Sequence, residues 1–497
     1  MDENTAYTSF NGAVFVQFYA GGPVYPMGSC VGVDSLPNPQ AGTTPEFCFE
    51  DGEFKTVAEL RTAPAQPAFN VTSLVGPAAD QLEVMKERKC PFNLYVTEVK
   101  CGDKYVFGNY DRAWAYRGCR ITDDPVSNPV NRNTESLLEK AYAVTGWNYR
   151  IDHRLLTATR IATAEVAGLN HITANNPNCG GACGAAREMC EQLFASADTV
   201  GAAIPDILLS VDSGNAWTSP PTGFAATTSV MCGATLWINE TTERQIFVRD
   251  TLAATPLQVE YTDDGAATWT QADVGATVAE AAVGGGSMYF IPNTIIGYIC
   301  TDDGRVYKTI DGGASWANQA SALAASGAAA LNAIHFSSAL VGYAVGAGDV
   351  IIGTVDGGVN WATMTATGSG DALTSVHVFS EQRLIVTTNN GVSDNPVYMS
   401  FDKTANWTII DNGIGAITTD TGACVTFMPD GLTGYLLIND VAPEGTIYKS
   451  INGGEHWKAL GAVANDGMSW LNICRENYAF AVGEISAATS FIARVNG

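Results

Sequence analysis

Between residues 205 and 497 the chain alternates short apolar runs with polar, glycine-containing turns. In one repeat the apolar runs are 331–336 (LNAIHF), 341–345 (VGYAV) and 350–354 (VIIGT), and a fourth covers 360–363. Short apolar runs bounded by turn signals predict β-strands. The same four runs recur along the region, and four short strands per repeat are typical of a β-propeller blade.

A turn motif lies between the third and fourth strand of each repeat. Its fullest form reads hydroxyl, any residue, Asp, any residue, Gly, any residue, Ser or Thr, Trp, as in 309–316 (TIDGGASW). Further copies occur at 210–217, 262–269, 354–361, 400–407 and 450–457, and successive tryptophans are 45 to 52 residues apart. This period is typical of a propeller or solenoid. Six copies predict six blades, with the ring closed by strands from 469–482 joining those from 207–218.

Each motif position has a physical role. The Asp, or Asn in the last copy, accepts backbone N–H bonds and closes a tight turn. The Gly adopts positive φ without a Cβ clash. The Trp covers the seam between neighbouring blades with its large apolar area. The predicted structural residues are Asp212, Trp217, Asp264, Trp269, Asp311, Gly313, Trp316, Asp356, Gly358, Trp361, Asp402, Trp407, Asn452, Gly454 and Trp457.

The repeated motif resembles the Asp-box (BNR) repeat of sialidases, sortilin-type receptors and photosystem II assembly factors. The resemblance covers residues 205–497 and implies a six-bladed propeller. In those families the box is a turn at the blade edge, remote from any active site, so the resemblance names no reaction.

The residues that catalysis would need do not form a recognisable pattern. A sialidase requires three arginines around a carboxylate, and no arginine of the propeller region lies in the motif typical of that family. Arg305 follows two aspartates, which favours a salt bridge in a hairpin, and His335 and His377 occupy matching strand positions expected in the core. We therefore expect no enzyme activity, no cofactor and no metal; the pairs 123–124, 263–264 and 302–303 are most simply solvated, with calcium as the alternative.

The first 170 residues predict a second β-rich domain. Strands are expected at 12–20, 68–75, 92–100, 105–122 and 147–166, with one helix at 77–89. This order predicts a β-sandwich flanked by a helix, for a mainly β protein overall. Residues 171–204 are expected to be a linker with a helix at 185–197. Its Cys179, Cys183 and Cys190 could bind a metal with His171, form disulfides, or be buried thiols.

Composition narrows the class of partner. The net charge is −25 with only 26 basic residues, so the chain is a poor candidate for binding nucleic-acid phosphates. No signal peptide or transmembrane stretch is evident, so we expect no membrane contact and a reducing compartment. Of the twelve cysteines, those in the propeller are expected to be buried thiols.

The element order of the first domain resembles that of a phage tail-tube protein. The resemblance implies a structural virion protein of the tail, assembled in the host cytoplasm as hexameric rings or a tube. It also implies contacts with other virion proteins, an outward-facing propeller touching a glycan or host surface, and DNA passage through an acidic lumen without specific binding. The alternatives are a carbohydrate-binding or sialidase-like propeller and a scaffold like the photosystem II assembly factors.

Overall fold

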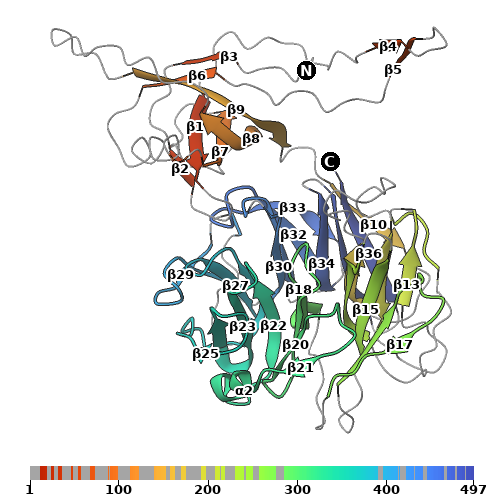
Figure 1. Ribbon diagram of the computed structural model, residues 1–497. Coiled ribbons are helices and arrows are strands. Elements are labelled where there is room, and N and C mark those ends of the chain that lie inside the picture. Colours follow the sequence, from red (N-terminus) through yellow and green to blue (C-terminus); the bar gives the residue numbers. More distant parts are fainter. Residues whose placement is uncertain are drawn as a thin grey trace. The chain divides into compact units, whose positions relative to one another are not determined.

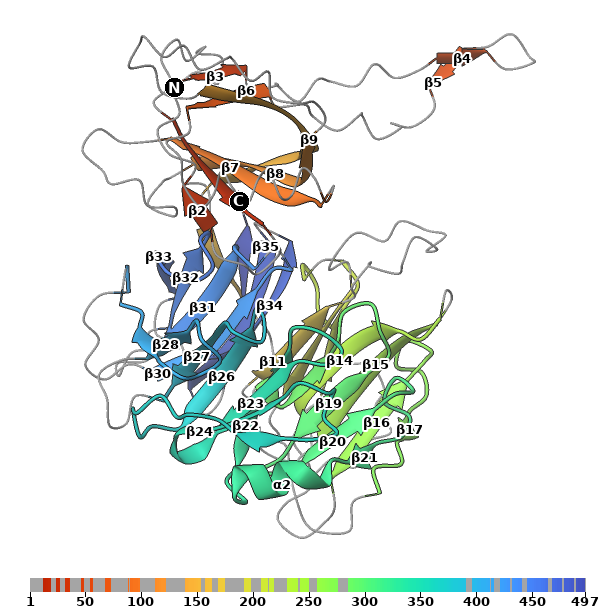
Figure 2. The same cartoon turned by 60° about the vertical axis from the view of Figure 1, so that its left-hand side comes forward.

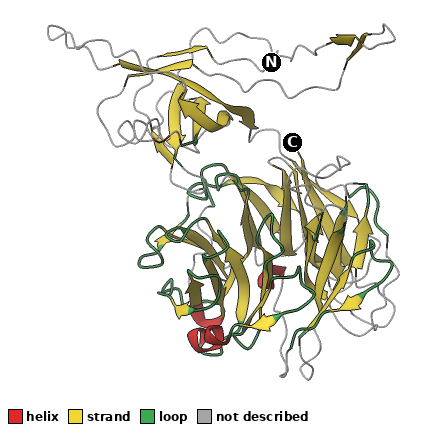
Figure 3. Ribbon diagram, viewed as in Figure 1, coloured by secondary structure: helices red, strands yellow, loops and turns green. Residues whose placement is uncertain are grey.

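The computed structural model divides into two compact units, residues 1–154 and 155–497 (Figure 1). The structure describes residues 12–18, 24–26, 32–35, 46–48, 54–56, 68–72, 88, 90–98, 112–121, 139–152, 157–162, 169–174, 192–197, 207–212, 214–218, 230–239, 242–249, 257–275, 285–389, 396–411, 413–414, 421–429, 431–439, 445–463, 467–475, 478–486 and 489–496. Almost all of these residues lie in strands and turns (Figure 3).

The first unit contains a seven-stranded antiparallel sheet in the order β2-β1-β7-β8-β9-β6-β3. Its strands are β1 (Gly12–Gln17), β2 (Val24–Pro26), β3 (Gly32–Ser35), β6 (Ala68–Thr72), β7 (Phe92–Glu98), β8 (Arg112–Ile121) and β9 (Glu139–Asp152). A separate hairpin pairs β4 (Glu46–Cys48) with β5 (Phe54–Thr56). The expected strands are present, but the described residues form one sheet and a hairpin, so the β-sandwich is not confirmed. The helix expected at 77–89 lies outside the described residues except for Arg88.

β1 and β7 are inner strands of this sheet, and side chains on both of its faces are buried. Phe15 is buried on β1, and the consecutive residues Leu94 and Tyr95, which point to opposite faces of the sheet, are both buried on β7. Gln17 is also buried, and its Oε1 accepts hydrogen bonds from Asn93 Nδ2 at 2.9 Å and the Tyr95 hydroxyl at 3.2 Å. These bonds satisfy a polar group that would otherwise destabilise the core.

The second unit is a seven-bladed β-propeller, and Figure 2 shows its blades arranged around a centre. Blade 1 contains β11 (Leu169–Ala174), β12 (Leu193–Ala197) and β13 (Ile207–Ser210), with Thr218 bridged to Leu209 in place of a fourth strand. Blade 2 contains β14 (Val230–Trp237), β15 (Glu243–Arg249), β16 (Gln258–Thr262) and β17 (Thr270–Gln271). Blade 3 contains β18 (Met288–Phe290), β19 (Gly297–Cys300), β20 (Val306–Thr309) and β21 (Ala317–Asn318).

The next blades repeat the same antiparallel order. Blade 4 contains β22 (Leu331–Phe336), β23 (Gly342–Gly346), β24 (Val350–Thr354) and β25 (Ala362–Thr363). Blade 5 contains β26 (Leu373–Val378), β27 (Leu384–Thr388), β28 (Val397–Ser400) and β29 (Thr408–Ile409). Blade 6 contains β30 (Thr421–Phe427), β31 (Gly434–Asn439), β32 (Gly445–Ser450) and β33 (Lys458–Val463). The short helices α2 (Ala320–Ser326), η1 (Gly285–Ser287) and η2 (Ala347–Asp349) connect strands.

Blade 7 joins the two ends of the propeller. It contains β34 (Gly467–Arg475), β35 (Tyr478–Ser486) and β36 (Thr489–Asn496), and its outer strand is β10 (Thr157–Ala162) from the other end of the unit. Thr157 pairs with Asn496 and Ala162 with Phe491. The ring is therefore closed by backbone hydrogen bonds between distant segments, which removes the open sheet edges.

The prediction of six blades is wrong because one of the seven blades has no box. A box is the turn between the third and fourth strands, and in blade 7 these strands come from opposite ends of the propeller. No box turn can connect them. Strands from 469–482 do not join 207–218 in one blade. β13 instead pairs with β12 in blade 1.

The described residues of the region expected to be a linker, 171–174 and 192–197, lie on propeller strands except for residue 192. β10, which the sequence analysis placed within residues 1–170, and β11, which crosses residue 170, are both propeller strands. The helix expected at 185–197 is wrong at its C-terminal end, where Leu193 and Phe194 lie on β12. Both residues are buried because β12 pairs with β11 and β13. An apolar run this short fits the periodicity of a helix and that of a strand equally well, so the sequence did not distinguish the two.

Neighbouring blades pack face to face through apolar clusters. One cluster joins Tyr298 and Val306 of blade 3 to Ile334 and Ala344 of blade 4. Another joins Ile172 of blade 1 to residues of blade 7 and closes the ring. Both faces of each inner strand are buried, which explains the nearly continuous apolar runs in the sequence. No helix among the described residues is long and apolar enough to cross a membrane.

Candidate functional site

The best-defined polar structure in the propeller is the Asp-box turn, and 309–316 shows its geometry. Thr309 Oγ1 donates to Asp311 Oδ1 at 2.8 Å and accepts from the Gly313 N–H at 2.9 Å. Asp311 Oδ1 accepts from the Ser315 N–H at 3.0 Å, and the Ser315 hydroxyl donates to Oδ2 at 2.5 Å. The hydroxyl and carboxylate together satisfy the backbone groups of a turn that has no strand partner.

The bonds of the hydroxyl and of the first side-chain oxygen recur in all six boxes, and the side-chain bond to the second oxygen recurs in the four boxes of blades 2 to 5. In each, the hydroxyl donates to the acidic or amide side chain two residues on, at 2.7 to 3.0 Å. The fifth position has positive φ in every copy, as predicted for its glycines. The residues there are Gly214, Ala266, Gly313, Gly358, Thr404 and Gly454. At Ala266 and Thr404 the turn therefore holds a non-glycine residue in the left-handed region, which costs about 1–2 kcal/mol.

Hydrogen bonds from the turn keep the box carboxylates ionised. The Ala216 N–H lowers the pKa of Asp212, and the Thr268 hydroxyl and N–H lower that of Asp264 to about 2. Donors on the seventh box residue likewise lower the pKa of Asp356 and Asp402. At Asp311 burial raises the pKa, but the donors of Ser315 and Thr309 outweigh it and the net shift is downward.

The box tryptophans lie at the seam with the preceding blade. Trp316 packs in the cluster shared by blades 2 and 3, Trp361 in that of blades 3 and 4, and Trp457 in that of blades 5 and 6. These three are 4%, 6% and 0% exposed. Trp217, Trp269 and Trp407 are half-buried against the corresponding seams. Copies with two consecutive glycines thus place their Trp deeper.

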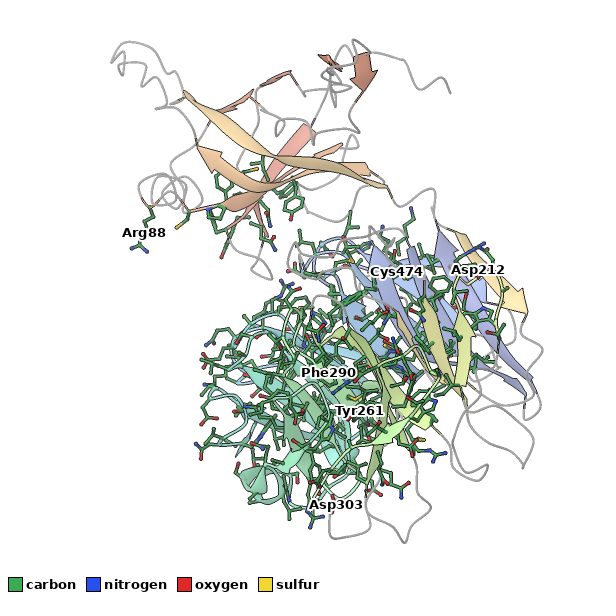
Figure 4. The ribbon with its side chains drawn as sticks, turned by 45° about the vertical axis from the view of Figure 1, so that its right-hand side comes forward. Arg88, Asp212, Tyr261, Phe290, Asp303 and Cys474 are labelled. Atoms are coloured by element: carbon green, nitrogen blue, oxygen red, sulfur yellow. The ribbon has the colours of Figure 1, made fainter. Side chains whose placement is uncertain are left out.

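In blades 2, 3 and 5, cationic or tyrosine side chains donate hydrogen bonds to the box of the following blade. The sequence analysis missed these contacts. Arg244 of blade 2 donates from Nη1 to the Gly312 carbonyl at 3.1 Å, pairs with Asp263 at 2.6 Å, and lies over the ring of Tyr261 (labelled in Figure 4). Arg383 of blade 5 donates to the Gly453 carbonyl at 2.8 Å. Both carbonyls belong to the fourth box position, so these arginines satisfy turn acceptors across a seam.

Blade 3 makes the equivalent connection with two side chains. The Tyr298 hydroxyl and Lys308 Nζ both donate to the Gly357 carbonyl, at 2.9 and 2.7 Å. The donor side chains lie 49 to 70 residues before their acceptors. Arg244 is the second residue of β15 and Arg383 directly precedes β27, so only an alignment of the repeats at the start of the second strand would have related the two arginines.

The histidines of the inner strands form a row of stacked rings. His335 lies between Tyr289 and His377, with ring centroids 4.3 and 4.2 Å away, and His377 contacts Phe427 at 5.0 Å. His335 Nδ1 accepts the Val378 N–H at 3.1 Å. Burial lowers the pKa of His335 to about 3, and burial with the neighbouring His335 and Arg383 lowers that of His377 well below its usual value. Both rings are neutral core groups, as the sequence predicted.

The remaining candidate residues do not converge on one place. Arg305 pairs with Asp303 in its own hairpin, as expected. Within the described part of the chain, no three His, Cys, Asp or Glu side chains are placed to hold a metal ion. His171 is buried beside Trp470, with ring centroids 5.3 Å apart. The cysteines expected near it lie outside the described residues.

The propeller cysteines are mostly buried thiols. Cys232, Cys300 and Cys424 are free and buried, and burial raises the pKa of Cys300 and Cys424 to about 12. Cys474, labelled in Figure 4, is disulfide-bonded, which corrects the expectation of a free thiol there. The apolar sequence around Cys474 predicted its burial but carried no information about a covalent partner.

Comparisons with known proteins concern the propeller. Residues 264–424 match the family model described as "Photosynthesis system II assembly factor YCF48". No curated protein matches the chain. Similar solved structures include YCF48 bound to D1 peptide, with 14% identity, a TM-score of 0.49, and coverage of 68% of this chain and 95% of that one.

Two other similar structures have the same level of identity. YCF48 from Cyanidioschyzon merolae has 13% identity and a TM-score of 0.46, with coverage of 68% of this chain and 98% of that one. The GH74 xyloglucanase from Xanthomonas campestris has 14% identity and a TM-score of 0.48, with coverage of 66% and 54%.

The expectation of a phage tail-tube protein located in the virion is wrong. The matched family is that of a photosystem II assembly factor, not of a virion protein. The tail-tube resemblance depended only on element order, which many unrelated β-rich domains share. The expected hexameric rings, virion partners and DNA passage followed from that assignment and have no other support. The C-terminal unit is a BNR-like Asp-box propeller, and its residues 264–424 are similar to the YCF48 family.

Proposed function

We propose that the chain is a binding scaffold that assists the assembly of a protein complex and catalyses no reaction. The observation that carries the proposal is the match of residues 264–424 to the family of a photosystem II assembly factor. The matched segment includes the complete boxes at 309–316, 354–361 and 400–407. A scaffold of this kind holds a segment of a partner protein on the propeller surface.

The rigidity of the propeller supports a binding role. The ring is closed by β10 and β36, and box hydrogen bonds and cross-seam contacts fix the turns. A surface that is already ordered loses little conformational entropy when a partner binds. This supports recognition by preformed loops and turns.

The state of the arginines supports the absence of hydrolase activity. Arg244 pairs with Asp263, Arg305 with Asp303, and Arg383 with Glu455. Each guanidinium has a carboxylate partner in or beside its own blade, whereas a sialidase needs arginines that converge on the carboxylate of the substrate.

The test is a binding measurement with the full chain. A fluorescently labelled sample is incubated with an array of short peptides that includes the D1 peptide, and hits are quantified by fluorescence anisotropy. Saturable binding of a subset of peptides is expected. A uniform lack of binding, or release of product from a panel of fluorogenic glycosides above the rate in buffer, would contradict the proposal.

A further inference from the structure

The large apolar side chains exposed on the described propeller gather at the box turns. Four of them occupy the second box position: Val211, Ile310, Val355 and Phe401, which are 64%, 69%, 50% and 45% exposed. Single apolar residues on a surface are ordinary. Recurrence at one position of a repeated turn is not, because this side chain takes no part in the hydrogen bonds of the box.

The exposed residues of three consecutive blades form one feature, which we call the apolar rim. It consists of Ile310 of blade 3, Leu340, Val355 and Val359 of blade 4, and Phe401 of blade 5. Leu340 lies beside its box, because its carbonyl accepts from the N–H of Gly357 at 2.9 Å. The hairpin and the box turn of blade 4 therefore present their apolar side chains at the same end of the blade.

Hydrogen bonds between blades fix the rim residues relative to one another. The Val359 carbonyl accepts from the Ser321 hydroxyl of blade 3 at 3.2 Å. On the other side, the Tyr343 hydroxyl of blade 4 donates to the Glu381 carbonyl of blade 5 at 2.8 Å. Rigid placement of apolar groups favours recognition of a partner over non-specific contact.

The rim is bordered by carboxylates that lack a cationic partner in their hydrogen bonds. Asp311, Asp356 and Asp402 each follow a rim residue directly, and their second oxygens accept from the neutral side chains of Ser315, Asn360 and Asn406. These bonds stabilise the ionised form but do not neutralise it.

The described residues of blades 3 to 5 carry nine Asp or Glu side chains and four Lys or Arg side chains. Lys403 pairs with Glu381 at 2.6 Å, and Lys308 donates to the Gly357 carbonyl at 2.7 Å, which holds this cation in place without neutralising it. Arg383 is 4% exposed and points into the seam. The rim therefore combines exposed apolar side chains with unbalanced negative charge.

We propose that the apolar rim docks a segment of a partner protein in which apolar residues alternate with lysine or arginine. The inference rests on the proposed scaffold function and names its surface and the chemistry of its partner. Apolar side chains of the segment pack on the rim, and its cations lie near the box carboxylates. A second copy of the chain fits less well, because a symmetric contact would bring like carboxylates together. An anionic membrane is repelled for the same reason.

The test compares a rim variant with a matched control. The rim variant carries Ile310→Ser, Val355→Ser and Phe401→Ser in the full chain. The control carries Val211→Ser, which changes the same box position with similar exposure on blade 1. All four side chains are exposed, but Phe401 also lies 5.4 Å from the guanidinium carbon of Arg383, so the control should melt like the parent and the rim variant slightly below it. The probes are labelled peptides of equal length with alternating Leu–Lys, Ser–Lys or Leu–Glu, measured by fluorescence anisotropy.

The parent and the control are expected to bind the Leu–Lys peptide, and the rim variant to bind it at least about tenfold more weakly. Equal affinity of rim variant and control would overturn the proposal. The proposal would also be overturned if the parent bound the Ser–Lys peptide as tightly as the Leu–Lys peptide, because binding would then depend on charge alone. Equal affinity for the Leu–Glu and Leu–Lys peptides would overturn it as well. Self-association in sedimentation, or flotation with phosphatidylserine vesicles, that the rim variant abolishes would also overturn it.

Failure of the rim can be told apart from failure of the scaffold function. If peptides from the array bind the parent and the rim variant equally, the chain is a scaffold but the rim is not its docking surface. If no array peptide binds the parent, the scaffold function itself fails.

Discussion

Removing the side chain of Trp316 should destabilise the propeller more than removing any other single side chain at the box turns of blades 2 to 5, when the box glycines are left unchanged. Trp316 is 4% exposed, lies between blades 2 and 3, and donates from Nε1 to the Gly313 carbonyl at 3.0 Å. A buried tryptophan removes about 150–250 Å² from water, and about 25 cal/mol per Å² gives roughly 4–6 kcal/mol. Because unfolded chains already bury part of this area, about 3–5 kcal/mol is the expected loss for Trp316→Ala.

The matched comparison is Trp407→Ala. Trp407 occupies the same box position in blade 5, but it is half-buried and its Nε1 donates to the Thr365 carbonyl at 3.1 Å. Its removal leaves a smaller cavity, so the expected loss is about half as large. The two variants remove the same side chain from the same box position, and they differ in the burial of the ring and in the acceptor of its Nε1 hydrogen bond.

The assay is urea denaturation of the full chain, followed by circular dichroism of the β-sheet signal. The free-energy difference comes from the midpoint shift at constant slope. Both variants alter the same unit, so the other unit contributes equally to each measurement. Parent-like unfolding of Trp316→Ala, or a larger loss for Trp407→Ala, would refute the assignment of these tryptophans to the blade seams.

Three further predictions follow from individual contacts. His335 is neutral in the fold with a pKa of about 3 and titrates near 6.5 when unfolded, so the unfolded state takes up the proton first as the pH falls. The contribution of His335 alone should therefore cost about 2 kcal/mol of stability in urea denaturation between pH about 7 and about 5; the buried His171 and His377 add losses in the same direction, so His335→Asn should reduce this slope without abolishing it. Gly313→Ala should destabilise by more than about 1 kcal/mol because φ is +85° and the new Cβ would meet a side chain of the preceding blade, whereas Ala266→Gly should be neutral or stabilising; equal melting shifts would contradict this. Arg383→Met should cost about 3 kcal/mol by leaving a box carbonyl unsatisfied across the seam, while loss of the half-exposed Arg305 should cost under about 1 kcal/mol; similar denaturation midpoints for the two would be inconsistent with a cross-seam role.

Several elements were predictable because their determinants are local. The strands 331–336 and 350–354 agree with β22 and β24, and the Gly313, Gly358 and Gly454 turns have the positive φ expected of them. The pairing of Arg305 with Asp303 was also predictable, since the two residues are two positions apart in sequence. In each case the partners lie within a few residues of one another.

Other features could not be derived from local patterns. The apolar residues 193–197 suit a helix or a strand, and only the pairing with β11 and β13 selects the strand. The tail-tube assignment failed for a related reason, because a list of strands and helices does not specify how they pair. The exposure of Ile310, Val355 and Phe401 likewise depends on the neighbours that the fold places around them, and the local sequence does not specify those neighbours.

The sequence by itself determined the kind of fold in the C-terminal unit and the construction of its turns. The hydroxyl and the Asp or Asn side chain of each box make their hydrogen bonds within eight residues, so Thr309 and Asp311 carry the information for their own turn. Only the tertiary structure decided the number of blades and the contacts between them. Blade 7 depends on the pairing of Thr157 with Asn496, and Arg383 reaches Gly453 across seventy residues. Such pairs are fixed by the closure of the whole ring, because the backbone groups of its last edge find partners only when the chain's distant strands meet.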